Sequence, residues 1–226
     1  MEGVQPDTAA RAQTRPLTDR QRERRAGILK ATNALLVRHG YDAVSMRAIA
    51  QAAGVAERTL FNIYSSKDAL VATCARERTE GIIQEAWEKA ADPGIGFVLS
   101  LCETLSWRTL EQPDVARALA PVLVQHADTV GLQDVYHRYV GRALDELARK
   151  GWLEQADIAM LTRLIGMRMV SAVALWAGRG IGDDALETHM RLAICEVLLP
   201  HARSDLHAWS QVEARRCVAT LAAEPA

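Results

Sequence analysis

Aromatic residues are scarce in this chain, which has two Phe, four Tyr and five Trp among its 226 residues. β-Sheets favour aromatic and β-branched side chains, whereas the abundant Ala, Leu, Arg and Glu favour helices. We therefore expect an all-α protein. An aromatic content of 5% also gives no sign of a multi-ring cage for a cationic ligand.

Cysteine is also sparse, and no C-x-x-C pair occurs among Cys74, Cys102, Cys195 and Cys217. This spacing favours buried free thiols in a reducing compartment over a zinc site or a disulfide framework. No apolar run approaches the roughly 18 residues needed to span a bilayer, and no basic-then-apolar signal sequence opens the chain. We expect a cytoplasmic protein without a membrane partner.

Charge is distributed unevenly although the net charge is only −1. Residues 1–78 carry 13 Lys and Arg against 8 Asp and Glu, whereas the remainder carries 14 against 20. A basic N-terminal part on an acidic body fits a DNA-binding domain joined to a domain with another task. Taken alone, the asymmetry also fits an ordinary solvated surface.

The stretch from Ser45 to Asp68 has the pattern of two short helices joined by a tight turn. Gly54 supplies a residue that is free to adopt positive φ between them. The first helix places four residues on one face: Met46, Ile49, Ala50 and Ala53. The second offers apolar residues to pack back onto it: Leu60, Phe61 and Ile63 or Tyr64. This is the plan of a helix-turn-helix, whose second helix enters the DNA major groove.

Polar residues on the second helix have side chains that suit base edges and phosphates. They are Glu57, Arg58, Thr59 and Asn62. Lys67 follows at the start of a third helix, with Ser65 and Asp68 at capping-box spacing. The backbone N–H groups there and the Lys charge form a candidate phosphate clamp. A plain helical pair with a polar outer face is the competing interpretation.

The order of residues in this segment resembles that of the DNA-binding domain of the TetR family of one-component transcriptional regulators. The family pattern is roughly T-x-x-x-I-A-x-x-A-G-V-S-x-x-T-L-Y-x-Y-F-x-S-K-E-x-L. The positions that match it or replace it conservatively are Ser45, Ile49, Ala50, Ala53, Gly54, Val55, Thr59, Leu60, Phe61, Tyr64, Ser66, Lys67, Asp68 and Leu70. The predicted DNA-contacting residues are Ser45, Arg47, Glu57, Arg58, Thr59, Asn62, Tyr64 and Lys67.

Two residues depart from the pattern. Ala56 replaces the usual Ser, which removes a side-chain N-cap worth about 1 kcal/mol. Ile63 stands where the family usually has an aromatic residue or His that touches phosphate. Tyr64 or Lys67 would have to supply that contact.

The expected organisation is a flexible tail over 1–17, a three-helix helix-turn-helix domain over 18–65 and a larger helical ligand-binding and dimerisation domain over 66–226. Thr18 and Gln21 form a capping box before the first helix, which ends at Gly40. A long helix over 66–91 links the two domains and is the candidate lever of a switch. Further helices are expected over 95–111, 114–127, 132–150, 156–177, 183–199 and 205–222.

The helices near 156–177 and 183–199 are apolar on more than one side, so each must be covered on more than one side. In the first, one face carries Leu161, Leu164, Ile165, Ala172 and Leu175, and another carries Met160, Met167, Val170 and Ala174. A homodimer through these two helices fits that pattern, and the TetR resemblance implies it. A buried central hairpin in a monomer is the alternative.

The resemblance also implies an apolar cavity for a small-molecule inducer. Candidate lining residues are Trp107, His126, Tyr136, Tyr139, Met167, Arg168 and Trp176, although such residue types are more often core. Arg168 lies in line with Leu164, Ile165 and Leu175. If buried, it would need Glu103, Glu196 or an anionic ligand as its partner.

The leading hypothesis is a homodimeric repressor that binds an inverted-repeat operator in double-stranded DNA and is released by an unknown small-molecule inducer. We expect no enzyme activity, cofactor or metal site, because the six His residues show no H-E-x-x-H spacing and no Ser lies in G-x-S-x-G. The alternatives are a helical small-molecule carrier or an enzyme without a recognisable catalytic motif, which substrate turnover would reveal, and a helical scaffold with a nonspecific basic head.

Overall fold

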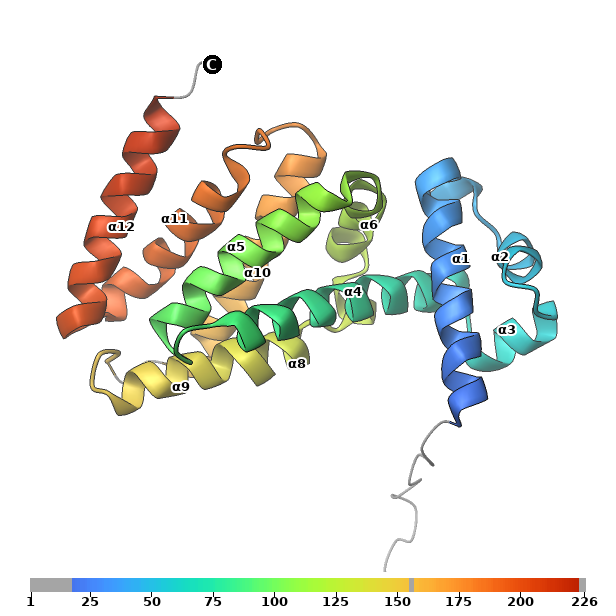
Figure 1. The fold of residues 1–226 in the computed structure, drawn as a ribbon, viewed down its shortest axis with the longest axis horizontal. Helices are drawn as coiled ribbons and strands as arrows, with labels where there is room; N and C mark the ends of the chain where they lie inside the picture. Colours follow the sequence, from blue (N-terminus) through green and yellow to red (C-terminus); the bar gives the residue numbers. More distant parts are fainter. Residues whose placement is uncertain (1–17, 155–156, 224–226) are drawn as a thin grey trace, which may run out of the picture.

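The computed structural model describes residues 18–154 and 157–223, so the predicted tail over 1–17 lies outside the described residues. The regular elements of the described residues are helices, which confirms the expected all-α class (Figure 1). In chain order they are α1 Asp19–Ala43, α2 Met46–Ala52, α3 Glu57–Ile63, α4 Lys67–Lys89, α5 Ile95–Glu111, α6 Pro113–Gln125, α7 Ala127–Val130, α8 Gln133–Tyr136, the π-helix η1 His137–Gly141, α9 Arg142–Arg149, α10 Ile158–Ala177, α11 Leu186–Leu198, the 3-10 helix η2 Leu199–His201 and α12 Ser204–Ala222.

Helices α1, α2 and α3 form a small unit at one end of the molecule (Figure 1). The predicted capping box at Thr18 and Gln21 is present at the start of α1, and the helix is interrupted at Gly40, where φ is 74°. The buried side chains of this unit come from all three helices: Ile28, Leu36, Ile49 and Leu60. Local capping and one shared core therefore fix the orientation of α2 and α3.

Helix α4 runs from this unit into the larger body, so it belongs to both parts of the molecule (Figure 1). Its N-cap is Ser66, whose hydroxyl accepts a hydrogen bond from the Ala69 N–H at 3.1 Å, and not Ser65 as the capping-box spacing suggested. Its 23 residues extend about 35 Å at 1.5 Å per residue. The domain boundary at residue 66 stays a prediction.

The larger body is a stack in which α11 packs against α5, α10 and α12 (Figure 1). The apolar side chains that α11 buries inside this stack are Leu186, Met190, Ile194, Val197 and Leu198. Because α12, α10 and α5 of the same chain all pack against α11, its apolar residues are largely covered within the protomer. The helix predicted over 132–150 is present as α8, η1 and α9. Its π-helical segment η1 was not predicted from the sequence.

Helix α10 corrects two expectations. It is long and apolar enough to span a membrane by length and composition, with a mean hydropathy of 1.6 over its apolar window, although we expected no such run. It packs against α6 and α11 within the larger body, and 39% of that window is buried. Leu164 and Leu175 are exposed, whereas the sequence pattern grouped them with the buried Leu161 and Ile165.

The four cysteines are free thiols buried in the protein, as the sequence predicts. Burial raises the pKa of Cys74 and of Cys195 to about 12. Because the thiolate is the reactive form, these groups are chemically inert packing residues.

Gly166 in α10 lies directly under the ring of Tyr136, and a Cβ there would come within 2.9 Å of the Tyr136 Cδ2 atom. We expect Gly166→Ala to lower the unfolding free energy by about 1–3 kcal/mol, because the buried ring has to shift. Gly81→Ala in α4 is the matched control: no atom lies within 4 Å of its Cβ position, and Ala stabilises a helix interior by about 0.5–1 kcal/mol. Urea unfolding of both variants checks this, and equal effects would contradict the packing argument.

Candidate nucleic-acid interface and internal cavity

The turn between α2 and α3 has the conformation that the sequence predicts. Ser45 caps α2 by accepting a hydrogen bond from the Ala48 N–H at 3.2 Å. Gly54 has a φ of 65° and turns the chain after α2. Leu60 is fully buried, so α3 is anchored on one side and leaves its opposite side free.

The free side of α3 carries the predicted groove-contacting groups. Glu57, Arg58 and Asn62 are exposed, and Thr59 is half-buried. Phe61 is 46% exposed among them, which corrects the expectation that it packs onto α2. An exposed aromatic ring beside Arg58 is suited to apolar contact with a thymine methyl group, so Phe61 joins the candidate DNA contacts.

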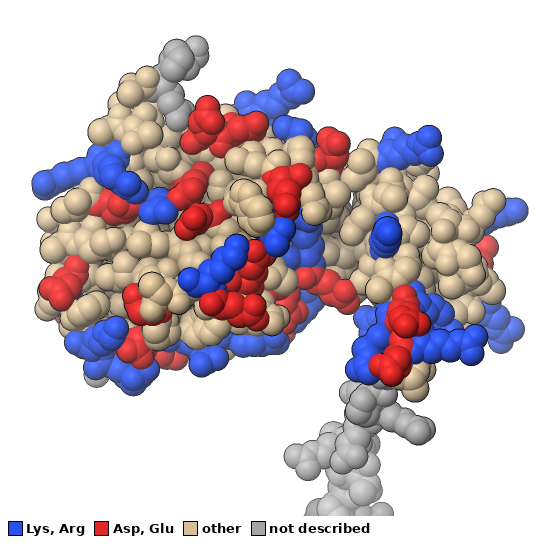
Figure 2. Space-filling model, viewed as in Figure 1, with Lys and Arg blue, Asp and Glu red and all other residues tan. Residues whose placement is uncertain are grey.

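The surroundings of α3 add further polar and basic groups. Ser45 and Arg47 are exposed at the start of α2. Lys and Arg side chains also gather at the start of α1, where Arg20, Arg22 and Arg24 are exposed (Figure 2). Such a surface suits the phosphate backbone of a duplex, which dominates the affinity of DNA binding.

Tyr64 is not on the surface, where a predicted DNA contact would place it, because the residue is only 4% exposed. Its ring lies 5.7 Å from the guanidinium carbon of Arg25 in α1, so it braces α3 against α1. Burial raises the pKa of Tyr64, and the neighbouring Arg25 partly offsets that rise. A phosphate contact from Tyr64 would require the side chain to leave this core.

Lys67 also has partners inside the protein. Its ammonium group donates a hydrogen bond to the Tyr41 carbonyl oxygen at 3.0 Å and lies 4.2 Å from the centre of the Tyr41 ring. The Tyr41 hydroxyl in turn donates to the Asp68 carboxylate. Burial and this hydrogen bond raise the pKa of Tyr41 to about 12. The predicted clamp therefore joins the end of α1 to the start of α4.

Ala56 is the N-cap residue of α3 and makes no side-chain cap hydrogen bond, as the sequence predicts. Ala56 is extended, with φ −68° and ψ 140°, which is the conformation of a Ser N-cap. We expect Ala56→Ser to raise the unfolding free energy by about 0.5–2 kcal/mol, measured by urea unfolding. Ala52→Ser, at the exposed last residue of α2 and away from any N-cap, is the control and should not raise the unfolding free energy.

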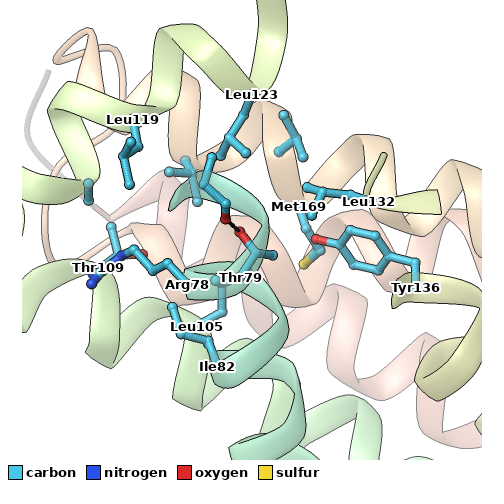
Figure 3. A pocket seen from close by; sticks show the side chains of 14 residues that line it. Arg78, Thr79, Ile82, Leu105, Thr109, Leu119, Leu123, Leu132, Tyr136 and Met169 are labelled. Carbon is cyan, nitrogen blue, oxygen red and sulfur yellow. Dashed lines mark hydrogen bonds between the residues drawn. The ribbon is translucent and has the colours of Figure 1, made fainter. Parts of the chain in front are cut away.

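The larger body contains a small, partly open apolar cavity with a volume of about 40 Å³ (Figure 3). Helices α4, α5, α6, α8 and α10 and the turn before α8 form its walls. The lining residues are Ala75, Arg78, Thr79, Ile82, Leu105, Thr109, Ala116, Leu119, Leu123, Leu132, Tyr136, Met169, Val170 and Val173. A second, more open cavity of about 220 Å³ lies next to it. The two share the wall residues Leu123, Leu132, Tyr136 and Val170.

Two of the seven predicted ligand-binding residues line these cavities. Tyr136 borders both, and Met167 borders the outer one while remaining 57% exposed. Arg78 also lines the inner cavity, although it was not among the residues predicted from the sequence. The helical spacing of the sequence could have indicated it, since Arg78 lies on the same face of α4 as the buried Ala75 and Ile82.

Four other candidates lie elsewhere. Trp107 is 48% exposed on α5, with Lys89 and Arg108 beside its ring. His126 stacks on Tyr41 where α6 meets α1, at a centroid distance of 5.7 Å.

The remaining two, Tyr139 and Trp176, pack within the larger body. Tyr139 packs on Trp87. Trp176 is buried and donates a hydrogen bond from its indole nitrogen to Asp183 at 2.7 Å.

Arg168 is exposed, so the burial that would require Glu103, Glu196 or an anionic ligand as its partner is not present in this structure. It lies on the same side of α10 as Leu164 and Leu175, which are also exposed. The chain itself covers the opposite side of this helix, where Leu161, Ile165 and Met169 are buried. Arg168 therefore flanks an uncovered apolar surface.

Known proteins resemble the chain in both sequence and fold. A family model described as "Bacterial regulatory proteins, tetR family" matches residues 28–74. The HTH-type transcriptional repressor KstR of Mycolicibacterium smegmatis is 27% identical over 182 residues, which cover 78% of this chain and 88% of the relative. KstR of Rhodococcus jostii is 52% identical over 58 residues, or 25% of this chain and 27% of the relative.

Solved structures match most of the chain. A TetR transcriptional regulator from Rhodococcus sp. RHA1 aligns with a TM-score of 0.64 and 18% identity, covering 80% of this chain and 98% of that one. FadR of Thermus thermophilus, solved in complex with lauroyl-CoA, aligns with a TM-score of 0.60 and 20% identity over 80% and 98%. At these identities the similarity establishes the fold.

Proposed function

Because the chain belongs to the TetR family of transcriptional regulators, we propose that it represses transcription by binding an inverted-repeat DNA operator as a homodimer and that a small molecule in the internal cavity releases it. The observation that carries the proposal is the exposed polar side of α3, anchored by Leu60 and presented by a helix-turn-helix. Within this proposal Arg58, Asn62 and Glu57 contact base edges, Glu57 by accepting a hydrogen bond from a cytosine amino group. Thr59, Ser45 and Arg47 contact bases or phosphates.

The proposed dimer forms through an apolar stripe on α10. Its four residues repeat on one side of the helix and are each at least 36% exposed: Met160, Leu164, Met167 and Leu175. Exposed Arg163 and Arg168 flank the stripe. Contiguous exposed apolar surface with a charged rim is typical of an interface between protein chains. The apolar residues of α11 are largely used inside the protomer, so α10 supplies most of this contact.

Helix α4 is the proposed connection between ligand and DNA. Its first turn is tied to α1 through Lys67 and Asp68, and its middle lines the cavity through Arg78, Thr79 and Ile82. Arg76, also in α4, donates hydrogen bonds to the carbonyl oxygens of Val130 and Gly131 in the turn that follows α7. A ligand that moves α4 away from α6 or α10 would reorient α3 in both protomers. A coupling free energy of about 1–3 kcal/mol would change operator affinity by roughly 5- to 150-fold.

Related proteins support a ligand role for the cavity. The TetR-family FadR of Thermus thermophilus was solved with lauroyl-CoA, and RolR, which aligns with a TM-score of 0.62 over 86% of this chain and 94% of that one, was solved with resorcinol. These ligands differ greatly in size and polarity. The fold therefore accepts unlike ligands, and the residues that line this particular cavity determine which one binds.

Selection of binding sites from a random duplex pool, followed by footprinting, tests the proposal. We expect an inverted repeat whose half-site centres lie one helical turn apart, about 34–36 Å, or a multiple of it. We also expect the affinity to fall steeply with salt, because phosphate contacts release counterions. Equal affinity for selected and random duplexes would contradict specific repression and favour a nonspecific scaffold.

A further inference from the structure

Arg78 provides the inner cavity with a cation that has no carboxylate partner among the described residues. Its guanidinium donates hydrogen bonds to the Arg108 carbonyl oxygen at 2.9 Å and to Gln112 Oε1 at 2.8 Å, both neutral acceptors. The two carboxylates on this side, Glu85 and Glu111, each pair with Arg108 at 2.7 Å. Burial and the neighbouring Arg108 lower the pKa of Arg78, and the charge of Glu111 only partly offsets this. An anion at this point would stabilise a charge that the protein leaves incompletely compensated.

Tyr136 provides a polar group at the other end of the cavity (Figure 3). The residue is 3% exposed and lies between the inner and the outer cavity. Burial and Cys102 raise the pKa of its hydroxyl. The hydroxyl is directed toward the cavity, so a ligand atom that accepts a hydrogen bond from it would add a favourable contact (Figure 3).

The wall between these two polar ends is apolar. It is formed by Ile82, Leu105, Leu119 and Met169, and Gly166 lets the Tyr136 ring rest directly on α10. A volume of about 40 Å³ is far below the roughly 300–1,000 Å³ of a typical ligand site. Binding of a ligand of ordinary size therefore requires this cavity to widen, and Tyr136 is the group between it and the outer cavity.

Resting on the proposed function, we propose that the inducer is an apolar organic acid whose carboxylate binds Arg78, whose body lies along the aliphatic wall and whose far end contacts Tyr136. Thr109 lines the cavity beside Arg78 and supplies a hydroxyl for the same carboxylate (Figure 3). Recognition by Arg78 explains selectivity for acids over neutral molecules of equal size, because a hydrogen bond to a charged group is stronger than one to a neutral group. The entry of the body between α4 and α10 explains why binding would alter the DNA-reading end.

Calorimetric titration with matched probes tests the assignment. The probes are decanoate and naphthoate, each compared with the alcohol of the same carbon skeleton. We expect the wild-type protein to bind at least one acid about tenfold or more tightly than its alcohol, and Arg78→Gln to abolish that preference. Arg78→Lys, which keeps the charge, should retain part of it. Tyr136→Phe should weaken the acid and its alcohol alike, since it removes only the distal hydrogen bond.

Arg149→Gln is the matched control, because Arg149 is exposed on α9 and lines neither cavity. It should keep the wild-type preference, and circular dichroism should show that each variant is folded. The assignment is overturned if neither acid binds, if the alcohols bind as tightly as the acids, or if Arg78→Gln keeps the preference. Operator binding by the wild-type protein without any acid is measured separately, so that failure of the DNA-binding proposal is distinguished from failure of the ligand assignment.

Discussion

Replacing Arg58 with Ala should weaken binding to the selected operator by roughly 30-fold to 10⁴-fold. Arg58 is exposed near the start of α3, the end of a recognition helix that approaches base edges. A bidentate contact between Arg and guanine is worth about 1–3 kcal/mol, and a symmetric dimer makes it twice, which gives about 2–6 kcal/mol in total. Fluorescence anisotropy at fixed salt measures the change, together with relaxed discrimination at one symmetric pair of operator positions.

Arg149→Ala is the matched control for this experiment, because it removes the same charge from an exposed position on α9, which lies at the other end of the molecule from α3 (Figure 1). It should leave operator affinity within about twofold of wild type, since distant surface charges are screened beyond about 10 Å at 0.1 M salt. A uniform loss of affinity for all duplexes with Arg58→Ala would mean that Arg58 contacts a phosphate and not a base.

The helix-turn-helix was readable from sequence because its signals are local. A Gly at the turn, Ser at the start of α2 and apolar residues three and four apart on one face each act within a few residues, and all three agree. The absent cap at Ala56 was readable for the same reason. The position of Ser66 as the cap of α4 was missed by one residue, because Ser65 and Ser66 are chemically equivalent and only the backbone distinguishes them.

The sequence did not show which of the two apolar sides of α10 is buried. Periodicity shows which residues share a side of α10, but it does not show which side the rest of the chain covers. The structure covers the side of Leu161 and Ile165 and leaves that of Leu164 and Arg168 exposed. That choice depends on where α6 and α11 pack, hence on the whole topology.

Candidate ligand residues were poorly predicted for a related reason. Rare, large side chains such as Trp107 and Trp176 attract attention in a sequence, yet one is on the surface and the other is satisfied by Asp183. Arg78 was overlooked because Arg is common in this chain. Its significance comes from Arg108, which takes both neighbouring carboxylates and leaves Arg78 with neutral acceptors.

Placing an aspartate in the apolar stripe of α10 should abolish both the dimer and operator binding. Leu175 is 55% exposed and lines neither cavity, so Leu175→Asp alters the proposed interface without altering the ligand site. Each dimer would bury two unpaired carboxylates, and the desolvation penalty is several kcal/mol for each. Because two linked helix-turn-helix units bind an operator far more tightly than one, loss of the dimer should lower operator affinity by at least about 100-fold.

Val212→Asp on α12 is the comparison that makes this prediction sharp, because Val212 is 67% exposed and apolar but lies on a different helix. Sedimentation velocity should show a monomer for Leu175→Asp and a dimer for Val212→Asp, with unchanged helical circular dichroism in both. A dimeric Leu175→Asp protein would contradict the proposed interface. If only Val212→Asp dissociated the dimer, the contact would lie on α12. The apolar stripe of α10, which Arg163 and Arg168 flank, would then need another partner.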